Sequence, residues 1–199
     1  MLSQSTVLAS DDFDSLIDDI ANHFKGDRRG LGYRAGSDDL VALYEGLQPV
    51  SFAVTALSDS GDNQVVNDFV RECKTDLEAD NKVFKDKTSE YTTALQSSRK
   101  EDDFDRRIDE MADKAKQDNA AAIDKWREKA KKLHKQFPAA SNAIAFAFQS
   151  VCSLAGKIYT AIINFFSSIV ENVAKWLENA WSSIKSFFST LSNTISGWI

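Results

Sequence analysis

The fold is decided by residues 66–95, VNDFVRECKTDLEADNKVFKDKTSEYTTAL. Apolar side chains recur here at spacings of three, four or seven, at Val66, Phe69, Val70, Cys73, Leu77, Phe84, Tyr91 and Leu95. This period is typical of an α-helix with one apolar face, and it continues for about eight turns without proline or glycine. A long amphipathic helix with a charged, solvated opposite face is therefore expected.

The segment that follows repeats the pattern. Ser98-Arg99-Lys100-Glu101 has the sequence of a capping box, which predicts a break between two helices. The second helix is expected to bury Phe104, Ile108, Met111, Ala112, Ala115, Ile123, Trp126, Ala130, Leu133 and Phe137. Two helices of roughly 35 residues, each about 50 Å long, would pack as a central antiparallel hairpin.

Upstream of this pair, a first helix is predicted to begin at Ser10 and to end near Gly26. Its apolar face comprises Phe13, Leu16, Ile17, Ile20 and Phe24. Residues 26–37 are expected to form a loop, followed by a short helix that ends near Pro49. Residues 50–57 fit either a strand or a helix, and the lack of a second candidate strand favours a helix.

Pro138 marks the boundary of the final third of the chain. Residues 136–156 carry no formal charge and are long enough to cross a bilayer, but Ala and Ser dilute their apolar character. Apolar residues at spacings of three and four instead predict amphipathic helix to the C-terminus, from Ile144 through Phe165 and Ile184 to Trp198. The predicted fold is all-α: an elongated multi-helix bundle with a long central helical hairpin and an aromatic amphipathic C-terminal helical region. Its expected parts are a charged bundle at 1–138 and an apolar region at 139–199.

Charge is distributed unevenly along the chain. Residues 1–113 carry 13 Lys and Arg against 25 Asp and Glu, whereas residues 114–138, the basic collar, carry eight against three. Residues 139–199 hold five charged residues but ten of the 21 aromatic ones. The net charge of −6 argues against a nucleic-acid-binding protein, because neutralising phosphates needs a basic face.

No residue pattern indicates catalysis. His23 and His134 have no Cys or Asp companion at the spacing of a metal site or a catalytic triad. The glycines of residues 26–36 follow a helix, whereas a nucleotide-binding loop follows a strand. A solvated connector is expected there, or a loop that touches lipid phosphates or an acidic partner. The chain is therefore predicted not to be an enzyme and to have no catalytic, cofactor or metal site.

One motif occurs twice. Residues 11–21 and 102–112 share Asp-Asp-Phe-Asp followed by Ile-Asp and Ala, with seven identities in eleven positions. Two helix starts with acidic first turns and the same buried face explain the match. The alternative is a carboxylate metal site of the Asp-Asp-x-x-Asp kind, for which Ser15 and Arg106 stand where the third Asp is needed.

The two cysteines, Cys73 and Cys152, lie within apolar patterns and are expected to be buried thiols, with a disulfide as the alternative. Residues 1–5 have neither the basic nor the apolar part of a secretory signal. The expected location is cytoplasmic or membrane-associated, with secretion by another route left open.

A basic helix beside an aromatic amphipathic region is typical of proteins that bind membrane surfaces. The leading prediction is membrane binding or permeabilisation, with anionic lipid as partner and homo-oligomers as a further step. The combination is similar in outline to helical pore-forming toxins, although no motif places the chain in that family. One alternative is a helical scaffold that binds another protein. The other is a lipid carrier. The predicted binding residues are Lys125, Arg127, Lys129, Lys131, Lys132 and Lys135 of the collar, with Phe165, Trp176, Trp181, Phe187, Phe188 and Trp198.

Overall fold

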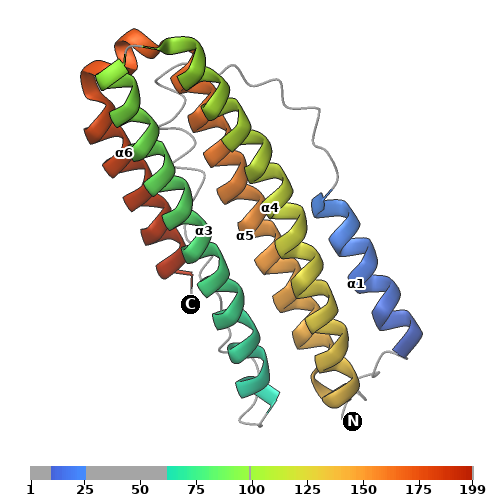
Figure 1. The fold of residues 1–199 in the computed structure, drawn as a ribbon. Coiled ribbons are helices and arrows are strands. Elements are labelled where there is room, and N and C mark those ends of the chain that lie inside the picture. The colour runs from blue at the N-terminus through green and yellow to red at the C-terminus, as the bar shows by residue number, and fades with distance from the viewer. Residues whose placement is uncertain (1–9, 26–61, 99, 199) are drawn as a thin grey trace. The chain divides into compact units, whose positions relative to one another are not determined.

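A computed structural model describes residues 10–25, 62–98 and 100–198. Over these ranges the protein has five α-helices, one 3-10 helix and no strand, so the predicted all-α bundle is confirmed. The helices are α1 (Ser10–Lys25), α3 (Asp62–Ser98), α4 (Glu101–Gln136), α5 (Ser141–Glu171) and α6 (Val173–Ser196), with the 3-10 helix η2 (Pro138–Ala140) before α5 (Figure 1). The loop and the helices predicted between residues 26 and 57 lie outside the described residues.

The described residues belong to two compact units, and α3, α4 and α5 each contribute to both. Unit 1 contains α1, the start of α3 to Cys73, the end of α4 from Asn119, η2 and the start of α5 to Gly156. Unit 2 contains the rest of α3, α4 and α5 together with α6. Each unit therefore combines residues from before and after Pro138.

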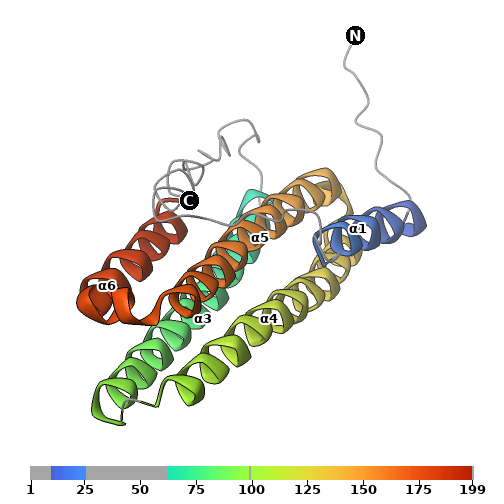
Figure 2. The ribbon, with the colours of Figure 1, turned by 90° about the horizontal axis from the view of Figure 1, so that it is seen from above.

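The core of unit 1 is built from α1, α4 and α5. Phe13, Ile17 and Ala21 recur every four residues of α1 and have no exposed surface. They pack in a core that includes Trp126 of α4 and Phe148 of α5. Figure 2 shows α1 beside these two helices. Cys73 and Cys152 are both buried in this unit as free thiols, which confirms that prediction.

The core of unit 2 is rich in aromatic residues. Leu77 and Phe84 of α3 and Phe104 and Ile108 of α4 are at most 2% exposed. The second copy of the repeated motif thus buries Phe104 and Ile108 as the first buries Phe13 and Ile17. The match between the two segments is explained by this common buried pattern.

The break between α3 and α4 falls where it was predicted, but its capping differs. Ser98 is the last residue of α3, and its hydroxyl donates to the Ala94 carbonyl at 2.9 Å. The first hydrogen bond of α4 runs from the Phe104 amide to the Lys100 carbonyl at 3.2 Å. Ser98 is therefore not the N-cap of α4. Contacts join α3 to α4 within each unit, through Glu72 and Lys129 in unit 1 and through Tyr91 and Arg107 in unit 2; the predicted hairpin stays a prediction.

Some predicted core positions of α4 were wrong. Phe137 is 37% exposed, and Ala112 and Leu133 are only partly buried. His134 takes the core position instead, because its ring stacks on Phe13 with centroids 4.1 Å apart. Its Nδ1 lies 2.7 Å from the Ser141 hydroxyl, so the polar edge of the buried ring has a partner.

Candidate membrane-binding region

Helix α5 is the most apolar helix of the chain among those described. The span Pro138–Glu171 has 34 residues, and its most apolar 18-residue stretch has a mean hydropathy of 1.3 and is 56% buried. By length and composition it is the single helix in the described ranges that could cross a membrane. The predicted apolar face is confirmed, since Ile144, Phe148, Val151, Ala155, Ile158, Ile162, Phe165 and Ile169 are all buried.

An unpredicted break separates α5 from α6 at Asn172. The Asn172 side chain accepts a hydrogen bond from the Lys175 amide at 3.1 Å and so caps the start of α6. The apolar spacing continues across this point, and for that reason periodicity alone gave no sign of the break. The signal in the sequence is the asparagine itself, a preferred N-cap residue.

The two helices meet in an aromatic cluster in unit 2. The rings of Phe165 and Phe187 stack with centroids 4.0 Å apart and an interplanar angle of 3°. Trp176 and Phe188 contact Phe165 edge-on, at 5.5 and 5.7 Å. Phe84 of α3 extends the cluster through Phe166, at 5.9 Å. Such ring pairs add to the free energy gained by burying the rings, so the cluster is a strong link between α5 and α6.

A hydrogen bond between Tyr159 and Asp80 links α5 to α3. The Tyr159 hydroxyl donates to the Asp80 carboxylate, and the tyrosine is only 2% exposed. Burial, more than any other effect, raises the pKa of Asp80, with smaller contributions from Asp118 and Asp76, while the Tyr159 hydrogen bond and Lys114 oppose the rise. Burial also raises the pKa of Tyr159, and Asp80 adds to that effect. The phenol therefore stays protonated and remains the donor.

Asn81, the neighbour of Asp80, links α3 to α6. Its Nδ2 donates to the Ser192 hydroxyl at 2.9 Å and lies 3.3 Å from the Phe188 carbonyl oxygen. Its Oδ1 is buried and has no hydrogen-bond partner among the described atoms. Two adjacent polar residues of α3 thus hold the two C-terminal helices, one each. Sequence reasoning missed both residues, although position 81 continues the apolar period from Leu77 to Phe84.

Helix α6 is kinked at Asn179, where φ is −129° and ψ is 15°. Trp181 follows the kink and is 49% exposed, the exception among the large residues of the predicted apolar stripe. Trp176 is partly buried, and its Nε1 has no hydrogen-bond partner among the described atoms. The six predicted aromatic site residues therefore fall into three groups. Phe165, Phe187, Phe188 and Trp198 are core residues, Trp176 is partly buried, and Trp181 is a surface residue.

Within the basic collar, the residues Arg127, Lys129 and Lys131 are engaged in ion pairs within unit 1. Lys131 Nζ lies 2.7 Å from Asp18 of α1. Arg127 lies 3.3 Å from Asp124 and 3.7 Å from Asp18. Lys129 pairs with Glu72 of α3.

The remaining collar lysines are more exposed. Lys135 is 3.8 Å from Asp14, and its side chain is 63% exposed. Lys125 and Lys132 are also exposed. Lys132 makes no ion pair with any residue in the described ranges. Of the six predicted collar residues, Arg127, Lys129 and Lys131 are thus the ones most occupied inside the protein.

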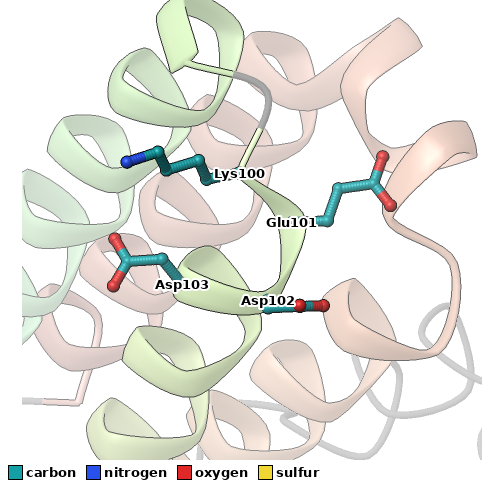
Figure 3. A pocket seen from close by; sticks show the side chains of 4 residues that line it. All are labelled: Lys100, Glu101, Asp102 and Asp103. Carbon is teal, nitrogen blue, oxygen red and sulfur yellow. The ribbon is translucent and has the colours of Figure 1, made fainter.

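A surface depression of about 440 Å³ lies at the start of α4, lined by Lys100, Glu101, Asp102 and Asp103 (Figure 3). Asp103 accepts hydrogen bonds from Arg106 at 2.6 Å and from Arg107 at 2.9 Å, and these partners lower the pKa of Asp103. In the described ranges no group of three or more His, Cys, Asp or Glu residues could hold a metal ion. Asp103 therefore pairs with two arginines of its own helix, Arg106 and Arg107.

Comparison with family models, characterised proteins and solved structures found no match for this chain. The geometry of the described residues is thus the basis for a functional proposal.

Proposed function

We propose that this chain is a membrane-binding helical protein that keeps α5 and α6 buried in a closed bundle and exposes them to lipid when the bundle opens. The observation that supports the proposal most is α5, a helix of membrane-spanning length and hydropathy whose most apolar stretch is 56% buried. An apolar helix of this kind gains nearly the same burial in lipid as in a protein core. Transfer from bundle to bilayer therefore costs little hydrophobic free energy.

The region carries few charges. Within Pro138–Glu171 the formally charged residues are Lys157 and Glu171, and Glu171 is the last residue of the helix. At the end of the span Glu171 reaches the interface at low cost, whereas Lys157 lies near the middle, where a charge is expensive. The polar face of α6, with Glu178, Ser182 and Lys185 exposed, suits a helix that lies in the interface.

The test is flotation of the full chain with vesicles of phosphatidylcholine, with and without phosphatidylglycerol, combined with release of an entrapped dye. We expect flotation with the anionic vesicles and a rise in tryptophan fluorescence as the exposed Trp181 enters lipid. Dye release that depends steeply on protein concentration would indicate that opened chains associate into a pore. Failure to float with both kinds of vesicle would overturn the proposal.

A second candidate function is that of a helical scaffold. Trp181 is 49% exposed and Phe146 is 63% exposed, and exposed aromatic residues are typical anchors of protein interfaces. A scaffold would use the closed bundle and would need no opening. It predicts that cross-linking α3 to α6 leaves activity unchanged, whereas the membrane proposal predicts its loss.

A further inference from the structure

Helix α1 covers unit 1 through an apolar stripe and a row of charges. On its inner side, Phe13, Ile17 and Ala21 are fully buried, and Phe13 stacks on His134 of α4. At the other end of α1, the Phe24 ring comes within 3.9 Å of the position that a Cβ would take on Gly156 of α5. The helix therefore shields surfaces of both α4 and α5.

The row of charges ties α1 to α4 in both directions. Asp18 of α1 accepts a hydrogen bond from Lys131 at 2.7 Å and lies 3.7 Å from Arg127. Lys25 of α1 donates to Asp124 at 2.7 Å. The side chains of Asp18 and Asp124 are 43% and 44% exposed, so salt and competing ions reach these pairs.

The collar residues that α1 occupies are the same ones that an anionic surface would attract. A carboxylate and a lipid phosphate offer the same kind of anionic oxygen to Lys and Arg. Asp18 thus holds Lys131 in the way that a lipid headgroup would, and it lies near Arg127, whose shorter ion pairs are with Glu128 at 3.0 Å and Asp124 at 3.3 Å on α4 itself. Asp18 of α1 therefore occupies a place on α4 where an external anionic group would bind.

We propose that Arg127 and Lys131 of α4 form a surface for anionic lipid headgroups, and that α1 occupies this surface until a membrane displaces it. The inference rests on the proposed membrane function and adds how the closed bundle is released. Three observations support it. The ion pairs of α1 are partly exposed and hence weak. A helix of 16 residues has little stability of its own once undocked. Its departure uncovers apolar surface of α5, the helix that is expected to insert.

The experiment compares two charge reversals on adjacent residues of α1. Asp18→Lys removes the pairs with Lys131 and Arg127 and replaces them by repulsion. Asp19→Lys makes the same charge change on an exposed residue that has no ion pair among the described residues. Because only the open form binds in this proposal, a less stable closed form raises the apparent affinity. We expect Asp18→Lys to bind phosphatidylglycerol vesicles about 3 to 10 times more tightly than Asp19→Lys, the range that a partly exposed ion pair and its reversal produce.

Hydrogen exchange of the unchanged protein gives a second, independent readout. On addition of anionic vesicles, amides of residues 13–25 should lose protection. Vesicle binding without loss of protection in α1, or equal affinities of the two variants, would overturn the inference and leave the proposed function standing. Absence of vesicle binding by the unchanged protein and both variants would overturn the proposed function and this inference with it.

Discussion

Tyr159 of α5 donates its phenolic hydrogen bond to Asp80 of α3, from a position that is 2% exposed. The next residue of α3, Asn81, holds α6 through Ser192. A buried hydroxyl needs a hydrogen-bond partner, and here the partner is the Asp80 carboxylate. Burial disfavours the charged form of this carboxylate and so raises its pKa. One turn of α3 therefore supplies a polar contact to each of α5 and α6.

Tyr159→Phe should lower the free energy of unfolding by about 1.5–3 kcal/mol, because it leaves a partly buried carboxylate without its donor. Tyr91→Phe is the matched control, because Tyr91 contacts Arg107 through its ring and the substitution keeps the ring. The guanidinium carbon of Arg107 lies 5.1 Å from the centroid of that ring. Urea denaturation, monitored by circular dichroism, measures the free energy of unfolding of both variants. Equal stability of the two variants would show that the Tyr159 hydroxyl contributes nothing to closure.

Asp80→Asn tests the same contact through its dependence on pH. The folded-state pKa of Asp80 is raised above the unfolded value, so the contribution of Asp80 to stability is full below the ordinary carboxyl pKa and is lost as pH rises through the folded pKa. Asparagine stays neutral and can still accept from Tyr159. At neutral pH we expect a rise in Tm of at most about 2–4 °C, and no difference below a pH of about 3.9.

Asp86→Asn on the exposed side of α3 is the control for the change in charge. A lower Tm of Asp80→Asn at neutral pH would mean that the charge-assisted hydrogen bond outweighs the cost of burying the carboxylate.

Much of the fold could be predicted from the sequence because the helices are long and their apolar period is unbroken. The face of α5 from Ile144 to Ile169 follows from spacing, and the boundary near Ser98 falls where it was predicted, although Ser98 does not cap α4. The break at Asn172 could not be found in this way, because the apolar period runs through it. Its cause is local, a side chain that caps the next helix.

The candidate site was less predictable, because composition does not say which surfaces meet. The collar and the acidic first helix are visible in the sequence, but the pairing of Lys131 with Asp18 across 113 positions is a tertiary contact. Likewise, Trp181 and Phe188 belong to one apolar stripe, and the kink at Asn179 precedes the point where one of them leaves the core. Which of these side chains lie in the core and which lie on the surface is therefore visible only in the packed structure.

Lys131→Gln and Lys132→Gln separate the two roles of the collar. Lys132 makes no ion pair within the described ranges, so its loss should change stability by less than about 0.5 kcal/mol and still weaken binding to anionic vesicles. Lys131→Gln breaks the pair with Asp18 and should lower stability by up to about 1 kcal/mol, and it also removes one of the two residues proposed to bind lipid headgroups. Thermal denaturation and vesicle flotation on both proteins make the comparison. Loss of stability in Lys132→Gln, with none in Lys131→Gln, would contradict this assignment.

Residues Trp181 and Phe188 give the sharpest distinction between a tail that inserts in lipid and one that is only core. Trp181 is 49% exposed, so Trp181→Ser should leave the free energy of unfolding within about 0.5 kcal/mol of its original value. If α6 enters the interface, the same change removes a large aromatic surface from lipid and weakens vesicle binding by about 2 kcal/mol.

Phe188 is 1% exposed, and its ring touches Phe165 and Phe187, so Phe188→Ser should cost at least about 3–5 kcal/mol and bring the chain close to unfolding. Phe188→Leu is the milder variant that keeps the fold and should lower Tm while raising dye release, because it weakens the closed state alone. Leakage and thermal stability should be measured on Trp181→Ser and Phe188→Leu together. Full leakage from Trp181→Ser, combined with reduced leakage from Phe188→Leu, would show that lipid contact depends on the intact core and would rule out insertion of α6.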